Sequence, residues 1–133
     1  MQPPERFDPR DPREWLNRAR SNLALAKRRE PDVYLEDLCF ECQQAAEKAL
    51  KGLILSRGGE FPYIHDLDML MAILEDAGVV VPREARRAVD LTVYAVAGRY
   101  PGPARSITPS EYETAVEIAE TVVRWAETTL RSR

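Results

Sequence analysis

The chain has 133 residues, 44% of them hydrophobic, and a formal charge of -3 at pH 7. This length and apolar content suit one compact domain, whereas the negative charge argues against an extended surface that grips nucleic-acid phosphates. No signal-like segment opens the sequence, and no apolar run approaches the roughly 18 residues of a membrane span. We therefore expect a cytoplasmic protein.

The first ten residues contain three prolines, so residues 1–10 are expected to form a flexible arm before a single helical domain over residues 11–133. A first helix is predicted from Asp11 as N-cap, with Pro12 in its first turn and Glu14 reaching back as in a capping box. It would end in the basic run KRREP. Four residues at helical spacing form its predicted buried stripe: Trp15, Ala19, Leu23 and Ala26.

The second predicted helix, residues 35–56, is long and two-sided, and we expect it to lie at the centre of the fold. It would be capped by Asp32 and end at Gly58-Gly59. Its apolar side is expected to hold Leu35, Leu38, Cys39, Cys42, Ala46, Ala49, Leu50 and Leu53. The other side carries a polar stripe at i, i+3, i+4 and i+7, formed by Gln44, Glu47, Lys48 and Lys51.

The two cysteines of this helix, Cys39 and Cys42, have the CxxC spacing of redox and zinc sites. The chain has no second CxxC, and its single histidine cannot complete a four-ligand site with them. Since both fall on the apolar side, we interpret them as small buried hydrophobic residues. No metal site and no cofactor are predicted.

A third helix is predicted to begin at His65-Asp66 and to end before Gly78, with Leu67, Leu70, Met71 and Leu74 facing inward. A fourth would begin at Pro82 and end at Gly98. Its predicted buried side holds Ala85, Val89, Thr92 and Val96, and its opposite side Arg83, Arg87 and Tyr94.

Residues 98–109 contain three prolines and two glycines, which predicts a loop. The last helix starts at Thr108-Pro109-Ser110-Glu111, which is a capping box with proline at the first helical position. Its apolar stripe runs through Tyr112, Ala115, Val116, Ala119, Val122, Val123, Ala126 and Leu130. Because no segment alternates with period two, the predicted fold class is an all-α antiparallel bundle of about five helices.

Three polar features are candidates for a functional site: the polar stripe Gln44, Glu47, Lys48 and Lys51, the lone His65 at a helix start, and Arg99-Tyr100 in the proline-rich loop. The stripe could be a solvated surface held by a Glu47–Lys51 pair. His65 could be a turn residue, and Arg99 could pair with Glu47 or cap a helix. If the loop folds over the central helix, the same groups could hold a phosphate and stack on a base.

The order of these motifs resembles a known family. The segment QAAEKALK at 44–51, followed by His65-Asp66-Leu67 and then Arg99-Tyr100-Pro101, is similar to the pattern of HEPN domains, and the likeness extends over roughly residues 12 to 130. It implies a helical bundle like the substrate-binding subunits of nucleotidyltransferases. It also implies a homodimer and a nucleotide-binding site made from Gln44, Glu47, Lys48, Lys51, His65, Arg99 and Tyr100.

The resemblance implies one of two roles. Many stand-alone HEPN proteins act with a minimal nucleotidyltransferase in a toxin-antitoxin module. Others are metal-independent ribonucleases that carry an arginine followed after four to six residues by a histidine. Here seven residues separate Arg57 from His65, the only histidine, so the ribonuclease reading is the alternative. Metal-independent RNA cleavage needs a group that exchanges protons near neutral pH, which histidine does best. Because the histidine here lacks the required spacing from an arginine, we expect a binding subunit and not an enzyme.

Dimerisation is also expected from apolar side chains that fall outside the main stripes, since contiguous exposed apolar surface often marks an interface. These residues are Phe40 and Ile54 on the central helix and Ile118 and Trp125 on the last helix. Neighbouring helices of the same chain could instead cover them.

Overall fold

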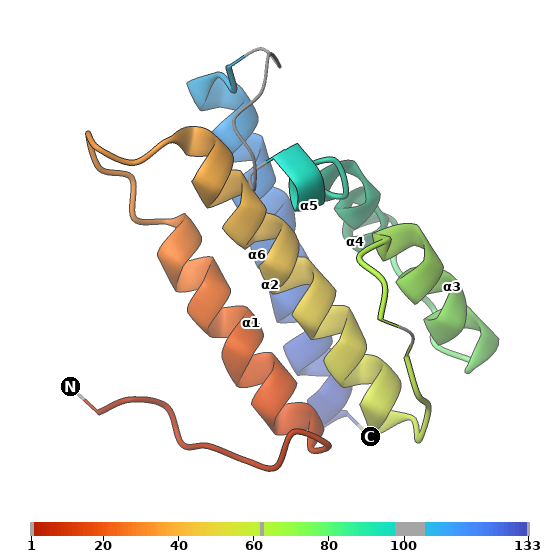
Figure 1. The fold of residues 1–133 in the computed structure, drawn as a ribbon. Coiled ribbons are helices and arrows are strands. Elements are labelled where there is room, and N and C mark those ends of the chain that lie inside the picture. Colours follow the sequence, from red (N-terminus) through yellow and green to blue (C-terminus); the bar gives the residue numbers. More distant parts are fainter. Residues whose placement is uncertain (1, 62, 98–105, 133) are drawn as a thin grey trace.

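The computed structural model describes residues 2–61, 63–97 and 106–132, and these contain helices and no strand. The elements are α1 (Pro12–Ala26), α2 (Leu35–Ser56), α3 (Leu67–Asp76), α4 (Arg83–Arg86), a 3-10 helix η1 (Arg87–Leu91), α5 (Tyr94–Ala97) and α6 (Pro109–Arg131). The predicted all-α fold class is confirmed (Figure 1). Every described helix is too short or too polar to serve as a membrane span.

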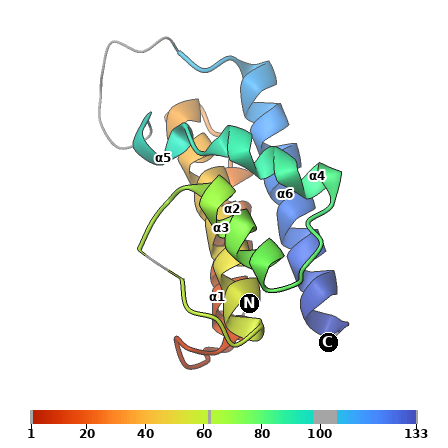
Figure 2. The same cartoon turned by 90° about the vertical axis from the view of Figure 1, so that its right-hand side faces the viewer.

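The long helices α1, α2 and α6 lie side by side, and α3, α4 and α5 pack on the far side of α2 from α1 (Figures 1 and 2). Helices α1 and α2 are antiparallel, whereas α6 runs in the same direction as α2 because the α3–α5 segment returns the chain to the start of the bundle. Helix α2 contacts α1, α6, α3 and α5. It is therefore central, as predicted.

Enclosure on several sides explains why α2 has no solvated face along its middle. Besides the predicted apolar stripe, Ala45 is wholly buried and Gly52 lies against α1. A Cβ at Gly52 would come within 3.1 Å of the Trp15 Cβ and 3.3 Å of the Pro12 carbonyl oxygen. The small residue lets α1 and α2 approach closely at this point.

Helix α1 begins as predicted, because the Asp11 carboxylate accepts the Arg13 N–H. The predicted capping box is wrong, since Glu14 accepts the Phe7 N–H and the Arg18 side chain instead. These two donors lower the pKa of the Glu14 carboxyl. The buried apolar residues of α1 are Leu16, Ala19 and Ala26, whereas Trp15 and Leu23 of the predicted stripe are only partly buried.

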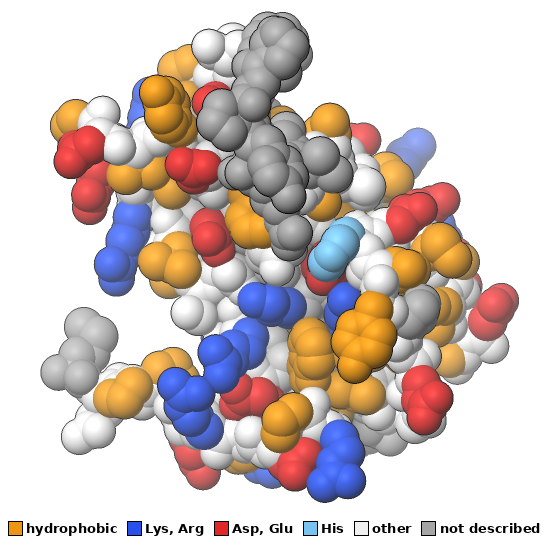
Figure 3. All heavy atoms as spheres, viewed as in Figure 1, with side chains coloured by type: hydrophobic (Ala, Val, Ile, Leu, Met, Phe, Trp, Pro, Cys, Tyr) orange, Lys and Arg blue, Asp and Glu red, His pale blue; other side chains and the backbone are white. Residues whose placement is uncertain are grey.

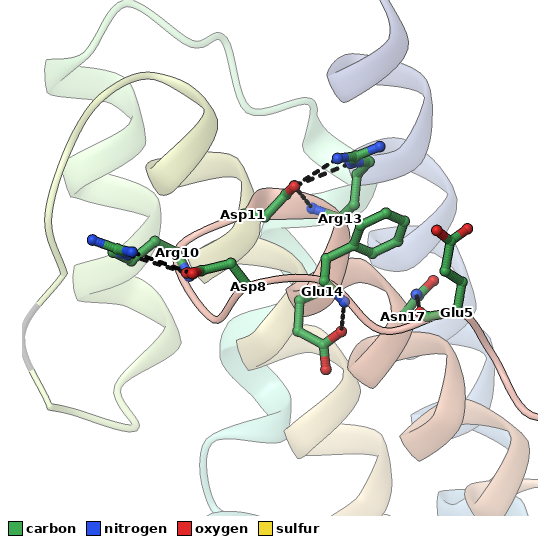
Figure 4. A network of polar contacts seen from close by, with 8 residues as sticks. Glu5, Asp8, Arg10, Asp11, Arg13, Glu14 and Asn17 are labelled. Atoms are coloured by element: carbon green, nitrogen blue, oxygen red, sulfur yellow. Dashed lines mark hydrogen bonds and ion pairs between the residues drawn. The ribbon is translucent and has the colours of Figure 1, made fainter.

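The residues before α1 run back along its outer surface (Figure 4). The Asn17 amide donates to the Glu5 carbonyl, and the Trp15 indole donates to the Pro9 carbonyl. Asp8 pairs with Arg10 at 3.1 Å. The segment from Glu5 to Arg10 is thus hydrogen-bonded in place.

Helices α2 and α3 match their predicted bounds closely. The predicted cap of α2 at Asp32 is wrong, because its N-cap is Tyr34, which makes no side-chain capping bond. Asp66 caps α3 by accepting the Asp68 N–H. The turns that follow the two helices use Gly58 and Gly78, whose φ angles of 76° and 87° suit glycine.

The predicted fourth helix is broken into α4, η1 and α5. Ala95 is buried in α5, and the other buried residues, Ala85, Ala88 and Leu91, are spaced by three as in a 3-10 helix, which has three residues per turn. The predicted stripe is right at Ala85 and wrong at Val89, which is 43% exposed, and at Thr92, which is only partly buried. The tighter winding moves these positions away from the core.

Helix α6 begins with the predicted capping box, in which Thr108 and Glu111 exchange hydrogen bonds with each other's backbone N–H. Its stripe packs against α2, with Ile118 buried as well and with Val116 and Leu130 only partly buried. The Tyr112 hydroxyl donates to the Ala26 carbonyl at 2.6 Å, which joins α6 to the end of α1.

Candidate functional site

The Glu47 side chain, 5% exposed, is the centre of a buried polar cluster. Its Oε2 accepts the Lys51 ammonium at 3.0 Å, and its Oε1 accepts the Gln43 amide at 2.8 Å. The His65 Nδ1 lies 2.8 Å from the same Oε1. We call Gln43, Glu47, Lys51 and His65 the Glu47 cluster. Gln43, Glu47 and Lys51 lie in the middle of α2, and His65 directly precedes the N-cap of α3.

The Lys51 side chain is covered by the Phe61 ring as well as by its carboxylate partner. Its Nζ lies 5.1 Å from the centre of the Phe61 ring, and Phe61 in turn packs edge-on against Trp15 with ring centres 5.0 Å apart. Lys51 is 5% exposed. The reading of Glu47 and Lys51 as a solvated pair is thus wrong, because α1 and the segment before α3 cover that side of α2.

His65 is the member of the cluster that reaches solvent, with its side chain 53% exposed. Its carbonyl also lies 3.4 Å from the Gln43 amide nitrogen. Two contacts with α2, one from the ring and one from the backbone, therefore hold the segment before α3. The interpretation of His65 as a turn residue is wrong, because it lies in an irregular segment directly before the α3 N-cap, and its ring has a buried carboxylate as partner.

Gln43 was missed by the sequence reasoning, although it is wholly buried. It links the cluster to the predicted Gln44, whose amide donates to the Gln43 Oε1 at 2.7 Å. The signal was the spacing of Gln43, Glu47 and Lys51 at i, i+4 and i+8, which places three polar groups in one row of a helix.

Lys48 points to the other neighbour, α1. Its Nζ donates to the Asn22 Oδ1 at 2.8 Å, and the Asn22 amide donates to Glu41 at 2.6 Å. Burial lowers the pKa of the Lys48 ammonium, and the charges of Arg18 and Lys51 lower it further, against the opposite effect of Glu41 and Glu47. Arg18 and Lys48 thus lie near each other between α1 and α2, together with the carboxylates of Glu14 and Glu41.

Side chains of Lys and Arg form a band across α1 and α2 on the face that also shows the histidine (Figure 3). This face combines half-buried cations with the exposed edge of the Glu47 cluster. The structure thus brings Gln44, Glu47, Lys51 and His65 into one network, with Lys48 beside it on α2. Arg99 and Tyr100, the remaining predicted site residues, lie outside the described residues.

The apolar residues predicted for a dimer interface differ in their burial. Ile54 and Ile118 are 2% and 3% exposed, so neighbouring helices of the same chain cover them, as the alternative interpretation held. Phe40 and Trp125 are partly buried. Of the four predicted residues, only Phe40 and Trp125 therefore have exposed apolar surface for a dimer interface.

Cys39 and Cys42 are free thiols in the core. Burial raises the pKa of each to about 12, with the Glu36 charge adding to the effect at Cys39. Thiols with so high a pKa are poor nucleophiles and poor metal ligands. Among the described residues, no group of three or more His, Cys, Asp or Glu side chains is placed to hold a metal ion.

A separate hollow of about 180 Å³ lies between η1, α5 and the start of α6. Its polar lining includes Asp90, Glu111, Ser110 and Thr114. Two carboxylates in its wall disfavour a phosphate. Ile118 lines it, but none of the described residues that were predicted for the nucleotide site does.

Comparison with known proteins places this arrangement in a family. The family model described as the HEPN domain matches residues 12–129. The crystal structure of TT1696 from Thermus thermophilus is similar at 38% identity and a TM-score of 0.72, covering 88% of this chain and 96% of that one. The crystal structure of ST0689, an archaeal HEPN homologue, shares the fold at 24% identity and a TM-score of 0.70, covering 90% and 98%.

No curated protein matches the sequence. The family match nevertheless spans most of the 133 residues, and it includes the Glu47 cluster, Lys48 and the α6 capping box. The chain belongs to the HEPN domain family.

Proposed function

We propose that this HEPN protein is a nucleotide-binding and interaction subunit that acts with a minimal nucleotidyltransferase, in a module of the toxin-antitoxin type. The observation that supports the binding role is the half-buried Lys48, which directly follows Glu47 on α2 and lies beside the Glu47 cluster. An ammonium has three N–H donors, and within the described part of the chain Asn22 accepts one of those of Lys48. Lys48 therefore keeps donors for a phosphate.

The half-buried position of Lys48 strengthens such a contact. Water screens a charge less where it is partly enclosed, so an ionic hydrogen bond to a phosphate contributes more there than on an open surface. Arg18 lies close enough to Lys48 for its charge to lower the Lys48 pKa, although Arg18 also pairs with Glu14 and the Glu41 charge acts in the opposite direction. Glu47 is already engaged by Lys51, Gln43 and His65, so its charge is partly offset within the cluster.

Calorimetric titration with a panel of nucleotides tests the binding role. We expect Lys48→Ala to weaken binding by about 1.5–3 kcal/mol, as for a lost charge-assisted hydrogen bond. Arg99→Ala tests the proline-rich loop in the same way. Lys27→Ala is the matched control, because Lys27 pairs with Glu120 at the end of α1. Absence of binding by every nucleotide to the wild-type protein would exclude the role.

The partner is tested separately, by inspecting the neighbouring gene and by co-purification. A short nucleotidyltransferase gene next to this one, whose product co-purifies with the chain, is the expected result. A gene with no such neighbour, together with a chain that purifies alone, would contradict it.

A second candidate function is metal-independent RNA cleavage, and the contact between His65 and Glu47 is the observation in its favour. A carboxylate that orients an imidazole is a common arrangement for proton transfer. Cleavage of RNA by the pure protein, lost in His65→Ala and kept in Lys27→Ala, would establish this role in place of the first.

A further inference from the structure

The partner of His65 determines which of its ring nitrogens carries hydrogen. Glu47 Oε1 lies 2.8 Å from the His65 Nδ1 and also accepts the Gln43 amide, while Oε2 accepts the Lys51 ammonium. A carboxylate paired with an ammonium has no proton to offer. The hydrogen between Glu47 and His65 therefore belongs to Nδ1.

This assignment leaves the Nε2 lone pair of the neutral ring as a hydrogen-bond acceptor. The side chain is 53% exposed, so a ligand can reach the ring. Since Glu47 is 3% exposed and Lys51 5% exposed, the His65 ring is the member of the Glu47 cluster that a ligand can contact most readily.

We infer that His65 is the acceptor for a sugar hydroxyl of a bound ribonucleotide, whose phosphate lies toward Lys48. The inference rests on the proposed nucleotide-binding role and adds the ligand's orientation and its chemical class. Lys48 directly follows Glu47 on α2, and its ammonium keeps N–H donors for an anion. A neutral imidazole with its lone pair outward accepts from a hydroxyl and offers no N–H to a phosphate.

The first experiment determines the tautomer in the wild-type protein. His65 is the only histidine, so a long-range ¹H–¹⁵N correlation spectrum at pH 8 reports on this ring alone. We expect the Nδ1–H tautomer to predominate, and a smaller excess of it in Glu47→Gln, whose amide is a weaker acceptor. A predominant Nε2–H tautomer in the wild-type protein overturns the inference whether or not nucleotides bind.

The second experiment compares adenosine monophosphate with its 2′,3′-dideoxy analogue by calorimetry. We expect the dideoxy nucleotide to bind about threefold to tenfold more weakly, which is the effect of one neutral hydrogen bond. His65→Phe, which keeps a ring but has no acceptor, should bind both nucleotides equally. Lys48→Ala should weaken both by the same factor and keep the preference for the ribonucleotide.

The outcomes separate the inference from the function on which it rests. Equal binding of the two nucleotides to the wild-type protein overturns the inference and leaves the nucleotide-binding role in place. Binding of neither overturns the nucleotide-binding role and the inference together. A ribonucleotide preference that persists in His65→Phe places the hydroxyl elsewhere and overturns the inference alone.

Discussion

Glu47 and Lys51 form an ion pair whose side chains are 5% and 6% exposed. Removing charges from water is costly, and the pair offsets this cost through its geometry and the added hydrogen bonds of Gln43 and His65. Removing one partner leaves the other buried and uncompensated. We expect Glu47→Ala to lower the free energy of unfolding by about 3–5 kcal/mol, measured by urea denaturation.

The chain contains a matched control for this prediction. Glu120 and Arg124 form a pair with the same four-residue spacing on α6, but Arg124 is 76% exposed. Arg124→Ala should change stability by less than about 0.5 kcal/mol. Similar losses in the two variants would show that burial does not set the cost of breaking the Glu47–Lys51 pair.

The two buried thiols make the free energy of unfolding depend on pH in the alkaline range. Folding raises the pKa of Cys39 and Cys42 from 9.0 to about 12. Above pH 9 the unfolded chain loses the thiol protons that the folded chain keeps, so the free energy of unfolding falls as pH rises toward 12. Urea denaturation at pH 8 and 10.5 should show a smaller loss in the Cys39→Ala, Cys42→Ala double variant.

Other groups that titrate in this range are shared by the wild-type protein and the double variant, so they cancel in the comparison. Equal losses of stability in the two proteins between pH 8 and 10.5 would show that the thiols are not responsible.

At the scale of single residues, the sequence predicted the identity of the polar groups better than their burial. It correctly placed Glu47 and Lys51 on the side of α2 opposite the main apolar stripe. Whether that side meets water depends on α1 and the segment before α3, which pack over it. Helical periodicity describes one helix and does not include these neighbours.

At the scale of elements, the start of α6 has the strongest local signal. Thr108 accepts the Glu111 N–H, and the Glu111 side chain accepts the Thr108 N–H. We expect Thr108→Ala to cost about 1 kcal/mol in urea denaturation, because the N–H loses its partner. Ser110→Ala, at an exposed position in the same turn, should stay within about 0.5 kcal/mol. Equal effects would exclude the cap as the cause.

The helices whose ends have local signals were predicted well, as α3 and α6 show. The segment after Pro82 was not, because one period of 3.6 residues was applied throughout. Ala85, Ala88 and Leu91 follow a spacing of three, and the winding is tighter there. Such a change of winding depends on packing against α3 and α6, which the sequence of the segment does not contain.

At the scale of the whole molecule, we expect a homodimer. Light scattering at micromolar concentration should give twice the 15.1 kDa mass of the chain. Because Ile54 and Ile118 are buried, a charge at the partly buried Trp125 is the more direct test. Trp125→Glu should reduce the mass toward that of one chain, whereas Arg131→Glu, on the exposed end of α6, should not. A single-chain mass for the wild-type protein would contradict the expectation.

The contact of Trp15 with Phe61 gives the protein an intrinsic optical reporter. Phe61 lies over the Lys51 ammonium, so the indole of Trp15 is one ring away from the Glu47 cluster. The chain has only two tryptophans, and Trp125 lies on α6. Replacement of Trp125 by phenylalanine would leave Trp15 as the single tryptophan, whose emission reports on the cluster without any added label.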